Sequence, residues 1–452
     1  MTRVAIIGGG ITGLSAAWHL QQQQIPFTLY EASDRVGGAI RTHHEADCLI
    51  EAGPNSLSGP NPQLDRLIEQ LNLTSELCPA NADASNRFIV RNGTPHPLPR
   101  TPLQFLQTPL FSAAAKWRLL QEPFIRTQSP PNETLADFAQ RRLGREPLDY
   151  ALAPFVGGIY AGNPHTLSAA AAFPTLIEME AQHHSLIKAM LHRAKQQRKA
   201  GKPREPRTIY TFKNGMQTLP DRIAEQLHPH IQLHQPVHHI QPLAQHLWNI
   251  HGEEYTDIIL TLPAHTQPQL DTPFDLSFLQ TIRHPAVTSL TLLYEKQQLT
   301  HPLNGFGMLV PPCENRFILG VLFPHSIFPD RAPPQHALLT VFIGGDLHPQ
   351  RANLPLEELL PPVENDLQHL LGLTGSPRHT SLHRWPNAIP QYTLDIPAIH
   401  QQLNHIETHH PGIHFAGTYR HGISISNALT SGETIAQRIM QSPRKEYGTT
   451  ST

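Results

Sequence analysis

Three glycines and one acid near the start of the chain have the types and spacing that a dinucleotide site requires. Gly8, Gly10 and Gly13 form a G-x-G-x-x-G pattern directly after the apolar residues 3–7, and Glu31 follows a second apolar run. The glycines allow a tight turn, a close approach of pyrophosphate to the backbone, and close packing of a helix on a strand. An acid about twenty residues further on accepts hydrogen bonds from ribose hydroxyls. The pattern therefore predicts a dinucleotide site.

A second group of glycines and arginines follows this acid. Residues 34–42 contain two adjacent glycines between two arginines, and residues 51–56 add another glycine-containing turn. Nicotinamide dehydrogenases have no such extension. It resembles the second signature of FAD-binding flavoenzymes of the amine oxidase superfamily. The resemblance implies that Gly37 and Gly38 let the backbone pass close to the flavin, and that Arg41 faces the pyrophosphate or the flavin.

These residues require a fold of alternating strands and helices to position them. Residues 3–7 and 27–30 are predicted strands, and residues 14–23 between them are a predicted helix. Predicted strands at 231–233, 237–240, 255–263 and 414–418 return to the same domain, and residues 428–440 are a predicted helix. A glycine turn at residues 417–424, before this last helix, predicts a second contact with the dinucleotide.

The remaining residues are expected to form a helical insert and a second domain. We predict an α/β, Rossmann-like FAD-binding domain that is discontinuous (residues 1–86, 206–269 and 385–452). An α+β substrate domain is expected over residues 270–384, with part of 87–100, as an antiparallel sheet with one long helix at 355–371. Its predicted strands are 287–294, 305–310, 317–323 and 338–343.

The helical insert is expected over residues 101–205. Residues 103–120 are predicted to form one helix with a broad apolar face. Gly157 and Gly158 interrupt an apolar stretch, which predicts a tight turn or a close approach to a ligand. Residues 192–207 are strongly basic; a solvated loop between domains is the favoured interpretation, and contact with anionic lipid is the alternative.

Composition restricts the class of protein. The chain has 452 residues, which favours two or three domains, and a net charge of −2, which excludes a strong attraction to nucleic acid. Its 30 histidines show no metal-ligand spacing, so we predict no metal site. Cys48, Cys78 and Cys313 are widely separated, which is typical of a reducing cytoplasm. No apolar run is long enough to span a membrane.

Four internal stretches give a more specific resemblance. They are residues 154–164, 87–89, 305–311 and 415–417, the last with Gly422. With the N-terminal pattern they resemble the protoporphyrinogen oxidases over essentially the whole length. The resemblance implies a largely apolar pocket for a porphyrinogen, with few catalytic side chains.

In this pocket, four residues are implied to contact the substrate. Phe306 would stack on a pyrrole ring, Leu309 would pack on another, and Arg87 would pair with a propionate. Gly158 would hold the macrocycle close to the flavin. The cofactor site would add a larger set of residues. They are Ile11, Thr12, Ala32, Arg35, Gly53, Pro54, Asn55, Val237, Thr261, Gly417, Gly422, Ile423 and Ser424.

The implied activity is that of an FAD-dependent oxidoreductase acting on CH–CH groups with oxygen as acceptor. Protoporphyrinogen IX would become protoporphyrin IX in three two-electron steps, with release of hydrogen peroxide, during haem biosynthesis. The implied partners are the porphyrinogen and dioxygen. Peripheral contact with membrane lipid through the helices at residues 103–125, contact with a downstream chelatase, and a homodimer are left open. The expected location is cytoplasmic, with the inner face of the cell membrane left open.

Three alternatives remain. A coproporphyrinogen III oxidase forming coproporphyrin III would bind four propionates rather than two and would need more cations. Another flavin amine oxidase or a carotenoid desaturase is disfavoured, because amine oxidases usually carry an acid after the Phe-Ala-Gly of residues 415–417, where this chain has Thr418. A non-catalytic scaffold that binds flavin and tetrapyrrole and serves a chelatase is a third alternative.

Overall fold

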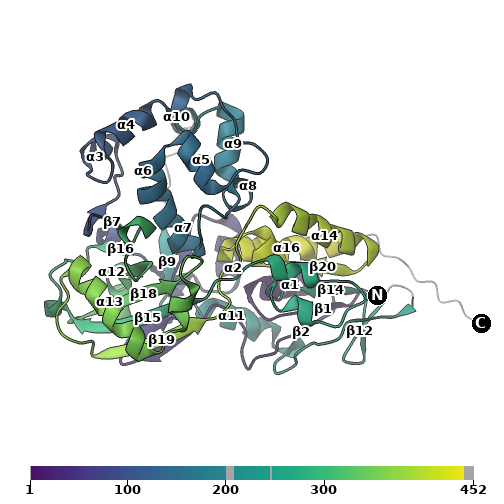
Figure 1. The fold of residues 1–452 in the computed structure, drawn as a ribbon. Coiled ribbons are helices and arrows are strands. Elements are labelled where there is room, and N and C mark those ends of the chain that lie inside the picture. Colours follow the sequence, from purple (N-terminus) through teal and green to yellow (C-terminus); the bar gives the residue numbers. More distant parts are fainter. Residues whose placement is uncertain (1, 200–207, 245–246, 442–452) are drawn as a thin grey trace, which may run out of the picture.

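The structure is a computed structural model that describes residues 2–199, 208–244 and 247–441 (Figure 1). Three parts meet near the centre of the molecule. A parallel sheet with its helices lies at one side, a larger mixed sheet lies at the other, and a helical part rises above them. This arrangement agrees with the fold class predicted from the sequence.

Five short strands form the parallel sheet. Their order is β10 (Ile231–Gln232), β2 (Phe27–Tyr30), β1 (Val4–Ile7), β14 (Asp257–Leu260) and β20 (Ile413–Phe415). β1 is completely buried, as expected for a central parallel strand covered on both faces. Residues 237–240 were predicted to be a strand, and this prediction is wrong. They make only an isolated bridge, His239 with Asp271, because the residue that they pair with lies in a loop.

Two long helices pack closely beside this sheet. α1 (Ile11–Gln22) follows β1, and α16 (Ile425–Gln441) begins three residues earlier than predicted. The contact depends on two glycines. A Cβ on Gly13 would lie 2.1 Å from the Gly8 carbonyl oxygen, and one on Gly432 would lie 2.3 Å from the Thr12 carbonyl oxygen. Any side chain at either position would push α1 away from its neighbours.

Seven strands form the mixed sheet. Their order is β19 (His379–Trp385), β15 (Val287–Glu295), β18 (His336–Gly344), β17 (Gly320–Leu322), β16 (Gly305–Leu309), β7 (Asn86–Arg91) and β8 (Thr94–Pro97). α13 (Leu356–Leu371) packs against it through a buried apolar face. The sheet was predicted to be antiparallel, but β16 and β7 are parallel, because β7 enters from far earlier in the chain. β17 is also shorter than the predicted strand at 317–323.

The helical part consists of short helices. They are α3 (Pro102–Gln107), α4 (Ala113–Leu120), α5 (Leu135–Arg142), α6 (Arg145–Pro147), the π-helical turn η4 (Leu148–Leu152), α7 (Ala153–Tyr160), α8 (Ala169–Ala172), α9 (Pro174–His183) and α10 (Leu186–Lys199). One prediction fails here, and another loses one of its two alternatives. Residues 103–120 are not one helix, because Pro109 follows the end of α3 and Ser112 caps a new helix through Ala115 N. Gly157 and Gly158 lie inside α7, so they form no tight turn, and the alternative prediction of a close approach to a ligand stays a prediction.

The described residues contain eight further strands and five further α-helices. The strands are β3 (Thr42–Glu45), β4 (Cys48–Glu51), β5 (Leu57–Ser58), β6 (Leu77–Pro79), β9 (Ile209–Phe212), β11 (Gln241–Pro242), β12 (Trp248–Ile250) and β13 (Glu253–Tyr255). The helices are α2 (Pro62–Gln70), α11 (Thr218–Leu227), α12 (Pro324–Ile327), α14 (Ile396–His409) and α15 (Thr418–His421). The predicted boundary near residue 205, part of the basic stretch 192–207, and the residues from 442 lie outside the described residues.

Candidate active site

Three loops, which follow β1, β14 and β20 in that order, meet at the carboxyl edge of the parallel sheet. The register aligns Ile7 with Leu260 and Leu260 with Phe415, so β1, β14 and β20 end at the same level. The Thr261 hydroxyl donates to the carbonyl oxygens of Ile7 and Gly8, at 2.9 Å each. A Cβ on Gly417 would lie 3.8 Å from the Thr261 carbonyl oxygen. Ligands of open α/β sheets bind at this edge.

The first of these loops has the geometry of a phosphate cradle. Gly8 has a φ of +110°, which turns the chain sharply between β1 and α1. Gly10 caps α1 without any side-chain hydrogen bond, and the direction of its absent Cβ is open, with no atom within 4 Å. Ile11 and Thr12 open the helix. The start of α1, where a helix offers amides and a partial positive charge, therefore borders open space, and these residues fit a dinucleotide pyrophosphate.

Glu31 lies across this loop. Its Oε2 accepts a hydrogen bond from Gly9 N at 2.7 Å, and its Oε1 accepts from Ser33 N at 2.9 Å. A carboxylate has further lone pairs, so Glu31 keeps acceptor capacity for a ribose hydroxyl. Ala32 is exposed beside it, and Gln235 N donates to the Glu31 carbonyl oxygen at 2.9 Å. Val237, two residues further, is buried in the core.

The second glycine group lies directly against the cradle. Gly37 N donates to the Gly9 carbonyl oxygen at 2.8 Å, and a Cβ on Gly38 would lie 3.3 Å from Gly10 Cα. The Arg35 guanidinium donates to Gly38 O at 2.8 Å and to Ile40 O at 3.0 Å, which holds the loop in shape. Burial, and then the nearby Arg41, lowers the pKa of Arg35. Arg41 itself is exposed.

The turn at residues 53–55 lies behind this loop. A Cβ on Gly53 would lie 1.9 Å from the Ala39 carbonyl oxygen, so only glycine fits there. Asn55 Nδ2 donates to Gly53 O at 3.0 Å, and Pro54 lies between them, half-buried. Trp385 Nε1 donates to Ala52 O at 2.9 Å from the edge of the mixed sheet.

The third loop joins β20 to α16. Gly417 and Gly422 have φ values of +133° and +108°, and Ile423 and Ser424 lead into α16. The Tyr392 hydroxyl lies within this loop, where it contacts Thr418 and Gly422. His421 Nδ1 lies 2.8 Å from Ser431 Oγ, and burial lowers the pKa of His421 to about 4. His421 is therefore neutral near pH 7.

Arg87 and Phe306 form one side of a second face, on the mixed sheet. The Arg87 guanidinium carbon lies 5.3 Å from the centre of the Phe306 ring, within the range of a cation–π contact. The parallel register between β16 and β7 shifts between Gly305 and Gly307, which leaves Phe306 out of the ladder. A β-bulge re-aims a side chain in this way. Arg87 is exposed and Phe306 is half-buried.

Gly158 brings α7 onto the same face. A Cβ on Gly158 would lie 2.6 Å from Leu309 Cδ2, so the missing side chain makes room for Leu309. Leu309 is aligned with Ile89 on the neighbouring strand. The structure thus gathers Arg87, Gly158, Phe306 and Leu309, the four residues predicted to contact substrate. Phe155 and Ile159 of α7 are 41% and 39% exposed nearby, and the sequence did not identify them.

The sequence also missed Gln217, Trp385 and Tyr392, which support the glycine loops. Gln217 Oε1 accepts from Arg35 at 3.0 Å. A lone polar residue such as Gln217 gives no signal in a single sequence. Trp385 and Tyr392 are aromatic residues next to turn segments, and for that reason they could have been suspected. Within residues 2–199, 208–244 and 247–441, no group of three or more His, Cys, Asp or Glu could hold a metal ion.

Comparison with known proteins gives a consistent result. A family model described as flavin containing amine oxidoreductase matches residues 11–440. Protoporphyrinogen oxidase 2, chloroplastic/mitochondrial, from Arabidopsis thaliana is 32% identical, over 95% of this chain and 92% of that protein. Protoporphyrinogen oxidase from Bos taurus is 30% identical, over 97% of this chain and 98% of that protein.

Solved structures agree. One from Exiguobacterium sp. 255-15, provisionally assigned as a protoporphyrinogen oxidase, has a TM-score of 0.82 and 26% identity, and covers 97% of this chain and 98% of that one. A putrescine oxidase has a TM-score of 0.70 and 17% identity, and covers 97% and 98% of the two chains. This second likeness concerns the fold alone.

Proposed function

The chain belongs to the flavin containing amine oxidoreductase family and, within it, to the protoporphyrinogen oxidases, and we propose that it oxidises protoporphyrinogen IX to protoporphyrin IX with FAD. It is a flavin-dependent oxidoreductase. The observation that carries the proposed substrate is the face formed by Arg87, Gly158, Phe306 and Leu309, which combines one cation with apolar surface. Such a face suits a large apolar macrocycle with few carboxylates.

FAD is the form of flavin that the loops suit best. Its pyrophosphate would lie on Gly10 and the start of α1, its ribose near Glu31, and its flavin end near Gly38 and residues 417–424. When bound, FAD supplies the two-electron acceptor, and dioxygen is the proposed final acceptor. The chain's own residues then have a positioning role. Arg87 binds a propionate, Phe306 and Leu309 hold the macrocycle, and α7 excludes water at Gly158.

The proposal is tested by a fluorimetric assay with protoporphyrinogen IX and coproporphyrinogen III side by side. Porphyrin formation from the first, at a kcat/KM at least tenfold higher than from the second, supports the proposal. A preference for coproporphyrinogen III would show that this compound, and not protoporphyrinogen IX, is the substrate. Oxidation of amines without turnover of either porphyrinogen would contradict the function as a whole. A protein that binds flavin and is never reduced by porphyrinogen without oxygen would be a scaffold.

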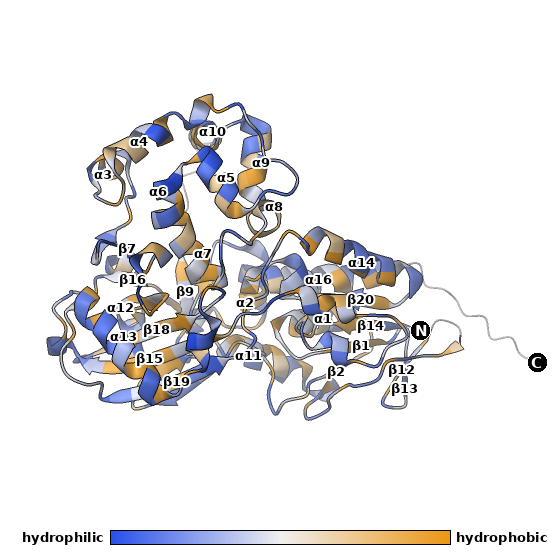
Figure 2. Cartoon of the chain, in the orientation of Figure 1, coloured by the Kyte–Doolittle hydropathy of each residue, from blue (hydrophilic) through white to orange (hydrophobic). Residues whose placement is uncertain are grey.

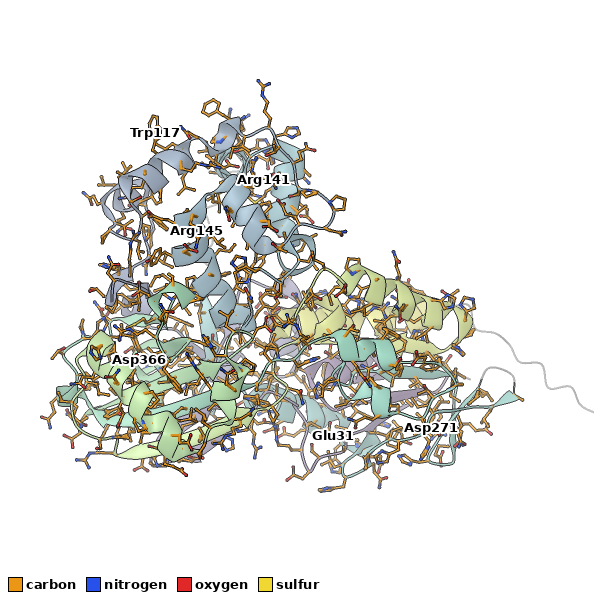
Figure 3. The ribbon with its side chains drawn as sticks, viewed as in Figure 1. Glu31, Trp117, Arg141, Arg145, Asp271 and Asp366 are labelled. Carbon is orange, nitrogen blue, oxygen red and sulfur yellow. The ribbon has the colours of Figure 1, made fainter. Side chains whose placement is uncertain are left out.

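The helical part provides a face for peripheral membrane contact, which we include in the proposal. It carries large apolar side chains that are between 56% and 81% exposed. They are Leu103 and Leu106 of α3, Trp117 and Leu120 of α4, Phe124 after α4, and Met190 and Leu191 of α10. Figure 2 shows hydrophobic segments along these helices, and Figure 3 places Trp117 at the outer edge of the helical part. Over the described part of the chain, no helix is long and apolar enough to cross a bilayer.

Exposed cations accompany this face, since α10 also carries Lys188, Arg193 and Lys195. Apolar side chains beside cations are typical of helices that lie on anionic lipid. Co-sedimentation with vesicles of phosphatidylglycerol and phosphatidylcholine should fall several-fold in the double variant Trp117→Ser, Phe124→Ser. Leu394→Ser, at a separate exposed leucine, is the control. Equal co-sedimentation of both variants and the unaltered protein would contradict the proposed contact.

A further inference from the structure

Tyr392 occupies an unusual place between the helical part and the loop that joins β20 to α16. Its side chain is only 4% exposed. Its hydroxyl donates to the Thr418 carbonyl oxygen at 2.5 Å and accepts from Gly422 N at 2.7 Å. Both bonds are made by one oxygen atom, so the hydroxyl is fully used and its position is fixed by the loop.

The two partners of this hydroxyl stand at the two ends of α15. Thr418 is the first residue of that single turn, and Gly422 directly follows its last residue. Gly417 and Gly422 have positive φ values, so the backbone on either side of the turn follows a path that other residues rarely adopt. A helix of one turn has little stability of its own. The Tyr392 hydroxyl therefore supplies the link that closes the turn.

The other end of Tyr392 is held by the helical part. Ser168 N donates to the Tyr392 carbonyl oxygen at 2.8 Å. The preceding residue, Gln391, is completely buried, and its Nε2 donates to the Tyr160 carbonyl oxygen at 2.8 Å. The rings of Tyr160 and Tyr392 lie 6.1 Å apart. Tyr160 ends α7, the helix that carries Gly158. One side chain thus joins α7, at the proposed substrate face (Arg87, Gly158, Phe306 and Leu309), to the loop after β20.

We propose that Tyr392 is a positioning residue whose hydroxyl sets the loop 417–424 and the first turn of α16 relative to α7. The proposal rests on the proposed function in one respect, the assignment of this loop to the flavin end of FAD. Tyr392 acts through the backbone that it holds. Its role is to keep the flavin end and the substrate face at a fixed separation, which hydride transfer requires.

The variant Tyr392→Phe separates this role from simple packing. Phenylalanine keeps the ring and its contact with Tyr160 and removes only the oxygen. Thr418 O and Gly422 N then lose their partner in a buried site, which costs more than the hydrogen bonds themselves contribute. The loop is expected to become mobile while the core stays packed. Tyr294→Phe is the matched control, because Tyr294 is fully buried and its hydroxyl bonds to Glu364 at 3.4 Å inside the mixed-sheet part.

Hydrogen exchange is the decisive measurement, because it does not depend on turnover. In flavin-free protein, peptides that span residues 417–425 should exchange at least tenfold faster in Tyr392→Phe than in the unaltered protein or in Tyr294→Phe. Protection elsewhere in the parallel sheet should stay unchanged. Equal exchange of residues 417–425 in all three proteins would overturn the proposal. If Tyr392→Phe does not fold, hydrogen exchange of the unaltered protein still tests the proposal. Amides of residues 420–425 that exchange without protection would also overturn it.

Flavin binding and kinetics give a second, independent readout. FAD should dissociate from Tyr392→Phe about tenfold more readily, as measured by recovery of free flavin fluorescence, and the visible flavin spectrum should shift. With porphyrinogen, kcat should fall while KM stays within twofold. A changed exchange and spectrum without porphyrinogen turnover by any variant would reject the proposed function and retain the role of Tyr392. Turnover with an unchanged spectrum and unchanged exchange would retain the function and reject this role.

Discussion

At the scale of single residues, the proposed substrate face (Arg87, Gly158, Phe306 and Leu309) combines a cation, an aromatic ring and a missing side chain. Arg87 lies over Phe306, so the aromatic ring helps to hold the guanidinium at this face. Gly158 leaves room for Leu309. Each of these features can be altered by one substitution with a separate expected effect on binding or on turnover.

Arg87→Ala should raise the KM for porphyrinogen about tenfold or more, because a charged hydrogen bond contributes about 1.5–3 kcal/mol. The kcat and the flavin content should stay within a factor of about two. Arg87→Lys should be intermediate, since lysine keeps the charge and loses the planar fork. Steady-state kinetics with Arg145→Ala as control test this, because Arg145 is an exposed arginine in the helical part (Figure 3). An unchanged KM would remove Arg87 from the substrate face.

Gly158→Ala should lower turnover and preserve stability. Alanine favours a helix over glycine by about 1 kcal/mol, so the thermal midpoint should hold or rise. Its Cβ would nevertheless meet Leu309 Cδ2 at 2.6 Å and displace that side chain from its present place in the proposed substrate face. Adding Leu309→Ala should recover part of the lost kcat. Without recovery in this double-mutant cycle, the two residues do not act together.

At the scale of elements, a buried ionic cluster fixes the start of α10. Glu122 is completely buried and accepts hydrogen bonds from Leu186 N at 2.9 Å and Ile187 N at 3.2 Å, where its charge meets the positive end of the helix. Arg142 of α5 pairs with Glu122 and with Glu180. The cluster holds α10 and the segment of Phe124, which both carry the exposed apolar face.

Arg142→Met should destabilise the helical part by about 3–5 kcal/mol, because it removes the cation that is paired with the buried Glu122 carboxylate. The lower thermal midpoint should be accompanied by faster proteolysis within residues 101–199. Arg145→Met is the control, since Arg145 forms an exposed pair with Asp149. Equal midpoints for both variants would show that the buried cluster adds no stability.

At the scale of the whole molecule, Glu51 joins the cofactor loops to the mixed-sheet part. Its carboxylate accepts from Thr42 Oγ1 at 2.7 Å and from Met216 N at 2.8 Å, and it lies 3.9 Å from Arg331. Arg331 in turn donates to Thr211 Oγ1 at 2.8 Å. Burial is the main cause that raises the pKa of Glu51, to about 7 from an ordinary 4.5.

The stability of the junction should therefore depend on pH. A raised pKa means that the folded state favours the protonated acid, so this stabilisation is complete below about pH 4.5 and is lost as the pH rises through about 7. Glu51→Gln should match the unaltered protein at pH 5 and exceed it at pH 8, by on the order of 3 kcal/mol. Thermal unfolding of both proteins at the two pH values measures this difference. If the difference in stability between the two proteins were the same at pH 5 and pH 8, titration of Glu51 would be excluded as the cause of that difference.

Much of the fold followed from local patterns. The fold class, the strands β1 and β2 and the helix α1 were predicted correctly. The apolar runs and the glycine spacing that define them are local patterns, which lie within about thirty residues of one another. The break between α3 and α4 was missed, since Pro109 and Ser112 were outweighed by a continuous apolar face. Val237 was placed in a predicted strand, but in the described structure residues 237–240 make only the bridge between His239 and Asp271.

The sequence by itself determined that this chain has a flavin-type nucleotide loop, because glycine conformation and helix polarity act between near neighbours. Only the tertiary structure decided which loops meet at the sheet edge and which side chains share the proposed substrate face. Gly8 and Thr261 are 253 residues apart in the chain, and Tyr392 and Gly422 are 30 apart. Contacts over such separations arise from sheet order and register, which no local pattern encodes.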